Sequence, residues 1–138
     1  MKNNSLLSDE GALEENSEGR GLLSPISASF PVRMMIRDSD TIHVLKVRDI
    51  EWIDACGNYV EIHSRGRTYL HRGSMTGISG RLSPETFVRL HRSAIVNRDK
   101  VREIRTVAKG KYSLVMSSGD ELPTRRPFNE VREMIVRT

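Results

Sequence analysis

The chain has 138 residues and a mass of 15.7 kDa, which suffices for one domain and argues against two. Its aliphatic runs span only a few residues, whereas a membrane helix needs about 20, so the sequence predicts no membrane insertion. No signal-peptide core is found, and Cys56 has no second cysteine to pair with. We therefore expect a cytoplasmic protein without disulfides.

Charge divides the chain into two parts. Residues 1–30 carry two Lys or Arg against five Asp or Glu, a net charge of −3, whereas residues 31–138 carry 20 against 13, a net charge of +7. Residues 1–29 are rich in Ser, Glu, Asn and Gly and lack sustained periodicity, which predicts a disordered acidic N-terminal tail. One folded domain is then expected at residues 30–138.

The first half of this domain predicts short strands. Residues 32–36 and 41–47 form a hairpin in this interpretation, because Asp38-Ser39-Asp40 supplies a turn between them. A strand is expected at residues 49–55, with Ile50 and Trp52 on one face and Ile53 on the other. Residues 59–64 and 67–72 predict a second hairpin.

The second half adds two short helices to further strands. Ser74 can cap a helix that carries Met75, Ile78 and Leu82, and apolar spacing after Pro127 predicts a C-terminal helix. Strands are expected to include residues 94–96 and 112–116. A hairpin turn at 118–120 leads into residues 121–124, which proline restricts to a sheet edge. The sequence therefore predicts a mostly β chain.

Motifs for catalysis or for metal binding are weak. The four histidines, His43, His63, His71 and His91, lack the spacing of a zinc site. No phosphate loop or dinucleotide motif is present, and we expect Cys56 to be a half-buried thiol. The sequence thus predicts a protein that is not an enzyme, with no catalytic residues, no metal site and no cofactor.

Positive charge is the more informative feature. Arg supplies 16 of the 20 cations after residue 30, and residues 89–126 hold ten cations against four acids. Arg forms two-point hydrogen bonds to phosphate and to guanine edges, which Lys does not. Composition leaves a solvated basic surface open, but the arginines at turns favour binding to nucleic acid.

Four segments in this order resemble the LytTR DNA-binding domain. They are Asn58-Tyr-Val-Glu-Ile-His63, Tyr69-Leu-His-Arg-Gly-Ser-Met75, Phe87-Val-Arg-Leu-His-Arg-Ser-Ala-Ile-Val-Asn97 and Gly119-Asp-Glu-Leu-Pro-Thr-Arg-Arg126. The resemblance covers about residues 32–137. The chain departs from the usual family pattern in having Ala94 where an aromatic residue is common and Arg125 where Ser is common.

The resemblance implies a fold class and a mode of binding. The fold is mostly β, with stacked short antiparallel sheets and one or two short helices, and loops instead of a recognition helix enter successive major grooves of duplex DNA. Base reading is implied for Asn58, Arg92 and Arg126, whose side chains suit adenine and guanine edges. Phosphate contact is expected for Arg89, His91, Arg98 and Arg125.

The resemblance also bears on partners. It implies a transcriptional regulator that binds double-stranded DNA and forms a homodimer on it. Most members of the family carry a phosphorylated receiver domain, and residues 1–29 are too few to form one, so a regulatory protein partner, a ligand or the expression level would control activity. Two alternatives remain at this point. The basic face could hold an acidic protein, or Tyr59, Tyr69 and Tyr112 could stack on RNA bases.

Overall fold

The structure is a computed structural model that describes residues 30–136, so the predicted tail at residues 1–29 lies outside the described residues. The described elements are, in chain order, β1 (Arg33–Asp38), β2 (Thr41–Lys46), the 3-10 helix η2 (Val47–Asp49), β3 (Ile50–Cys56), β4 (Tyr59–Ser64), β5 (Arg67–Arg72), α1 (Met75–Ser79), β6 (Phe87–His91), β7 (Ala94–Asn97), the 3-10 helix η3 (Arg98–Lys100), β8 (Val101–Ala108), β9 (Lys111–Met116), β10 (Glu121–Thr124) and α2 (Phe128–Val136).

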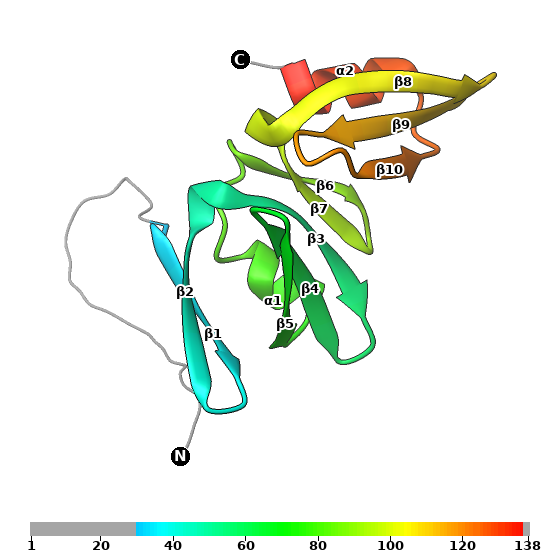
Figure 1. The fold of residues 1–138 in the computed structure, drawn as a ribbon. Helices are drawn as coiled ribbons and strands as arrows, with labels where there is room; N and C mark the ends of the chain where they lie inside the picture. The colour runs from blue at the N-terminus through cyan, green and yellow to red at the C-terminus, as the bar shows by residue number, and fades with distance from the viewer. Residues whose placement is uncertain (1–29, 137–138) are drawn as a thin grey trace.

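Residues 30–136 form three antiparallel sheets. The largest has five strands in the order β5-β4-β3-β7-β6, and the others are the β1-β2 hairpin and a three-stranded sheet with the order β10-β9-β8. Figure 1 shows the three-stranded sheet and α2 above the five-stranded sheet, with the β1-β2 hairpin at its other side. The predicted fold class is confirmed.

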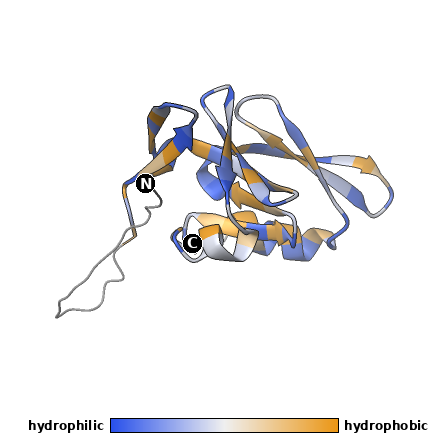
Figure 2. Cartoon of the chain, turned by 90° about the horizontal axis from the view of Figure 1, so that it is seen from below, coloured by the Kyte–Doolittle hydropathy of each residue, from blue (hydrophilic) through white to orange (hydrophobic). Residues whose placement is uncertain are grey.

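Apolar residues fill both sides of the five-stranded sheet. One core lies among this sheet, the β1-β2 hairpin and α1, and includes Ile36, Ile53 and Ile78. The other lies among β6, β7, the three-stranded sheet and α2, and includes Leu114 and Val131. Figure 2 shows orange and blue alternating along strands, as expected where one face of a strand is exposed, whereas β7 is buried at all four residues because it lies between the two cores. The five-stranded sheet is therefore the central layer.

Trp52 and Ile50 lie on opposite faces of β3, whereas the sequence predicted that they share one face. Ile50 and Ile53 both lie in the first core, whereas Trp52 packs on the second. The pairing of β3 with β4 shifts register between Ile50 and Trp52, and such a bulge reverses the alternation of faces. Trp52 Nε1 then donates to Asp120 Oδ2 at 3.1 Å, which connects the central sheet to the β9–β10 turn.

Several local predictions are confirmed. Ser74 caps α1, since its Oγ accepts a hydrogen bond from the backbone N–H of Gly77 at 2.9 Å. The strand that contains Pro123, β10, is the outer strand of the sheet β10-β9-β8 in the part of the chain that the structure describes. Cys56 differs from the expected half-buried thiol, because it lies at the exposed end of β3. Neither α1 nor α2, within residues 30–136, is long and apolar enough to cross a membrane.

Folding stability is expected to fall in mild acid because of His71. Burial on β5, and secondarily the charge of Arg81, lower the pKa of His71 below its ordinary value of 6.5. The unfolded chain then binds a proton at this site at a higher pH than the folded chain, so stability decreases as pH falls below about 6.5. Urea unfolding at pH 7.5 and pH 5.5 measures the loss.

The matched variant is His71→Gln, which cannot titrate. We expect it to lose less stability than the wild type between the two pH values, because the other histidines are common to both proteins. Equal losses in the two proteins would contradict the role of His71.

Candidate functional site

Two turns lie together at one end of the five-stranded sheet. β3 ends there and β7 begins there, because the two strands are antiparallel, with Asp54 opposite Ala94. The backbone N–H of Ala55 donates to the carbonyl of Ser93 at 3.0 Å, so the end of β3 is bonded to the β6–β7 turn. In Figure 1 the β3–β4 turn, the β6–β7 turn and the end of β10 follow one another along the right-hand side.

The β3–β4 turn presents Asn58. Gly57 before it has a φ of +62°, a left-handed conformation that favours glycine. The carbonyl of Asn58 accepts a hydrogen bond from the N–H of Gly73 at 3.1 Å, which fixes the backbone. The side chain of Asn58 is exposed and makes no hydrogen bond within residues 30–136. Its amide is therefore available for a two-point contact of the kind that recognises adenine.

Internal hydrogen bonds fix the β6–β7 turn. Nη2 of Arg89 donates to the carbonyl of Arg92 at 2.8 Å, and the N–H of Ser93 donates to Nδ1 of His91 at 3.2 Å. The neutral tautomer that accepts this bond carries its proton on Nε2, so exposed His91 keeps one donor. The guanidinium of Arg92 is exposed and has no ion pair or hydrogen bond within the described residues. The turn thus holds a free arginine on a rigid backbone.

Arg126 joins the end of β10 to both β6 and α2. Its Nε donates to the carbonyl of Leu90 at 2.7 Å, and its Nη1 contacts Glu130 Oε1 at 3.1 Å. Its backbone N–H donates to the hydroxyl of Thr124 at 3.2 Å. Leu90 lies at a bulge of β6, where the register with β7 shifts. The side chain of Arg126 therefore connects β6 to the first turn of α2.

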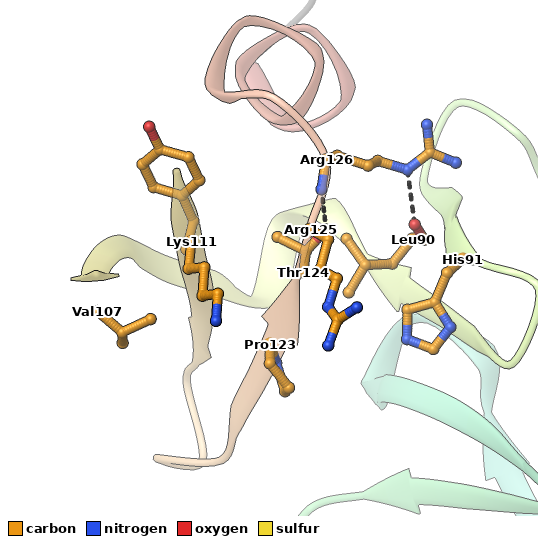
Figure 3. Close-up of a pocket in the computed structure, with 9 residues that line it drawn as sticks. Leu90, His91, Val107, Lys111, Pro123, Thr124, Arg125 and Arg126 are labelled. Atoms are coloured by element: carbon orange, nitrogen blue, oxygen red, sulfur yellow. Dashed lines mark hydrogen bonds between the residues drawn. The ribbon is translucent and has the colours of Figure 1, made fainter. Parts of the chain in front are cut away.

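A groove of about 700 Å³ lies between the end of β6 and the three-stranded sheet. We call it the cationic groove, and its lining residues are Leu90, His91, Val107, Lys111, Tyr112, Pro123, Thr124, Arg125 and Arg126. Figure 3 shows Lys111, Arg125 and His91 extending to the same side, while Arg126 turns towards Leu90. No acidic side chain among residues 30–136 lines the groove, so its described lining attracts anions such as phosphate.

The structure brings most of the predicted site residues together, with one exception. Asn58, Arg92 and Arg126 lie on connected turns, and Arg89, His91 and Arg125 lie beside the last two. Arg98 follows β7 at the end away from these turns, where its N–H donates to the carbonyl of Thr86 at 2.8 Å. Sequence reasoning missed Lys111 as a groove residue, since its position depends on the β8–β9 pairing with Ala108.

One group of described side chains has the composition of a metal site. Single ligand atoms of Asp54, Glu61 and His63 all lie within 4.8 Å of one another on β3 and β4. Nε2 of His63 is already 2.9 Å from Asp54 Oδ1, and its Nδ1 is 3.1 Å from Thr68 Oγ1. The ring also stacks on Trp52 at 3.9 Å. Hydrogen bonds and stacking therefore explain the positions of His63 and Asp54, and Glu61 lies opposite Asp54 in the β3–β4 pairing.

The three tyrosines considered for RNA stacking do not form a row. Tyr59 lies near Arg72, Tyr69 contacts His43, and Tyr112 contacts Phe128. Tyr69 packs against the first core, whereas the last pair belongs to β9 and α2. A stacking platform would need neighbouring exposed rings.

Residues 40–135 match the family profile of the LytTr DNA-binding domain. The transcriptional regulatory protein LytR of Staphylococcus aureus (strain bovine RF122) is 24% identical over 115 residues, which are 83% of this chain and 47% of the relative. The transcriptional regulatory protein YpdB of Escherichia coli K12 is 29% identical over 119 residues, with 79% of this chain and 49% of the relative covered. The chain thus spans about half the length of these relatives.

The fold has a solved counterpart. The LytTr DNA-binding domain of a putative methyl-accepting/DNA response regulator from Bacillus cereus superposes with a TM-score of 0.67 at 19% sequence identity. The superposition covers 75% of this chain and 96% of the other. The arrangement of sheets and helices is therefore shared despite the low identity.

Proposed function

Because the chain belongs to the LytTR DNA-binding domain family, we propose that it is a sequence-specific transcriptional regulator that binds duplex DNA in the bacterial cytoplasm. The observation that carries this proposal is a chain of hydrogen bonds. Ala55 at the end of β3 bonds to the β6–β7 turn, and Arg126 after β10 bonds to β6 beside the cationic groove. Fixed turns lose little conformational freedom on binding, and a groove without carboxylates favours the DNA backbone.

The residues divide into two roles in this proposal. Asn58 and Arg92 read base edges in the major groove, because both side chains are exposed on fixed backbone and have free polar groups. Arg126 supplies a third base contact from the β10–α2 connection. Arg125 and His91 hold phosphates from the walls of the groove, and Lys111 is added to this set. The proposal gives Arg89 a supporting role within the turn and leaves Arg98 outside the contact surface.

Turns, and not a helix, make these contacts in the proposal. α1 has only five residues, and it buries Met75 and Ile78 in the first core. α2 packs Val131 into the second core and carries both acidic and basic side chains on its exposed side. α1 is too short to offer an exposed recognition face, and Glu130 and Glu133 on the exposed side of α2 would repel phosphate.

Salt dependence and competition test the proposal on the full chain. We expect labelled duplex to be displaced by duplex DNA, and only weakly by single-stranded RNA or by polyglutamate. If six to ten phosphates are contacted, the logarithm of the binding constant falls with the logarithm of salt concentration with a slope of about −5 to −9. The stoichiometry of the same titration tests the further proposal that two copies occupy one DNA site.

Each alternative gives a different result in this experiment. A nearly flat salt slope would contradict the basic-surface argument, and stronger competition by RNA would favour the RNA-binding alternative. Displacement by polyglutamate alone would favour a module that binds an acidic protein.

A further inference from the structure

The carbonyl of Leu90 determines where the guanidinium of Arg126 lies. The bulge in β6 puts Leu90 outside the regular pairing with β7, so that its carbonyl accepts from Arg126 Nε at 2.7 Å. Leu90 itself is fully buried. The contact therefore anchors the inner part of the guanidinium and leaves its two terminal nitrogens at the surface, beside the turn that carries Arg92.

The carboxylate of Glu130 accepts a hydrogen bond from one of these terminal nitrogens. An arginine has five N–H donors, and a two-point contact to a base or phosphate uses two adjacent nitrogens. With Nε bonded to Leu90, the remaining adjacent pair is Nη1 and Nη2, and Nη1 is 3.1 Å from Glu130 Oε1. The backbone of Glu130 is fixed at the start of α2, where its N–H donates to the carbonyl of Pro127 at 3.0 Å.

The ion pair is open enough to be exchanged for another acceptor. The side chains of Arg126 and Glu130 are 40% and 52% exposed, so water and salt reach both. An exposed pair four residues apart contributes little to stability. A nucleic-acid acceptor that reaches Nη1 can therefore replace the carboxylate without rearrangement of the fold, since the bond to Leu90 remains.

We propose that Glu130 is a built-in competitor for Arg126: its carboxylate holds Nη1 in the free protein, and a specific DNA site must displace it. This inference rests on the proposed function, because it needs a duplex that Arg126 contacts. Glu130 then limits the affinity for the correct site although it contacts no DNA itself. Only duplexes that place an acceptor at Nη1 can replace the carboxylate, so the ion pair weakens the binding of Arg126 to other duplexes.

Two variants of the full chain isolate this effect. Glu130→Gln removes the charge and the ion pair, and Glu133→Gln removes one charge from the same helix at an exposed residue with no ion pair within residues 30–136. Both reduce general repulsion of phosphate by one charge. We expect Glu130→Gln to bind the selected duplex about two- to fivefold more tightly than Glu133→Gln does. This factor corresponds to the free energy that an exposed ion pair contributes.

A double-mutant cycle provides the decisive readout. In an Arg126→Gln background, Glu130→Gln and Glu133→Gln should bind the selected duplex with equal affinity, because the guanidinium for which Glu130 competes is absent. If Glu130 acts instead through folding or through general repulsion of phosphate, the difference in affinity would remain in that background. Affinities are measured by fluorescence anisotropy at one salt concentration, with a random duplex measured in parallel.

The outcomes separate this inference from the proposed function. If the wild type binds the selected and the random duplex equally, the proposed function fails. If the wild type discriminates but Glu130→Gln binds like Glu133→Gln or more weakly, the proposed function stands and the competitor role of Glu130 is overturned. An advantage that survives in the Arg126→Gln background also overturns it.

Discussion

Arg92→Ala is expected to weaken binding to the selected duplex by about 1–3 kcal/mol, roughly fivefold to 150-fold, and to change binding to random duplex much less. Arg92 is exposed on the β6–β7 turn, and its guanidinium has no partner within the described residues. A two-point contact from this guanidinium to guanine is lost in the variant, whereas most phosphate contacts remain. The ratio of specific to random affinity, measured by fluorescence anisotropy, is the readout.

The turn should keep its shape in this variant. Arg89 bonds to the backbone carbonyl of Arg92 and not to its side chain, so alanine leaves that bond in place. The matched control is Arg125→Ala, which removes a cation from the cationic groove. A lost phosphate contact lowers both affinities alike and reduces the magnitude of the salt slope by about 1. If Arg92→Ala behaves like Arg125→Ala, the base-reading role of Arg92 is wrong, and DNA shape would better explain specificity.

Asn97→Ala is expected to cost about 2–4 kcal/mol of the free energy of unfolding. Asn97 is 1% exposed, and its Nδ2 donates to the carbonyls of Ile50 at 2.8 Å and of Arg48 at 3.3 Å. Its Oδ1 accepts from the N–H of Asp99 at 2.9 Å. Alanine leaves the buried carbonyl of Ile50 and the partly buried backbone groups of Arg48 and Asp99 without this partner, and it also removes packed atoms. Urea unfolding at pH 7.5 measures the difference.

An exposed asparagine provides the control. Asn129 lies on the surface of α2, and Asn129→Ala is expected to change stability by less than about 0.7 kcal/mol, with alanine the better helix former. Asn97→Asp keeps the acceptor for Asp99 and loses the two donated bonds, so it should also destabilise strongly. A cost below about 0.5 kcal/mol for Asn97→Ala would contradict the structural role of this amide.

Hairpins and caps were predictable from the sequence because their signals are local. The two strands expected at residues 59–64 and 67–72 have those bounds in β4 and β5. Their alternation is regular, and glycine lies in the turn between them, at a φ of +77°. The cap of α1 by Ser74 and the edge position of Pro123 likewise depend on single residues and their neighbours.

β-Bulges explain why the strand β8 and the orientation of Trp52 in β3 were not predictable from the sequence. Val101, Ile104 and Val107 lie three residues apart, a spacing that hides a strand, because β8 shifts register against β9 near both ends. The bulge in β3 similarly separated Trp52 from Ile50. An extra residue in one strand breaks the two-residue period on which strand prediction depends.

The residues of the site were indicated by the resemblance, but their arrangement was not. Arg126 and Leu90 are 36 residues apart, and their hydrogen bond depends on how the three-stranded sheet packs on β6. The groove position of Lys111 likewise requires the register of β8 with β9. The pair of Arg126 with Glu130 has helical spacing, so the sequence contained that signal.

Selection of bound duplexes from a random pool by the full chain tests whether these turns recognise a DNA sequence. We expect enrichment of short related sequences, and we expect Arg92→Ala to relax the preference at particular guanine positions within them. Enrichment of no sequence, together with a salt slope near zero, would contradict sequence-specific DNA binding by these turns.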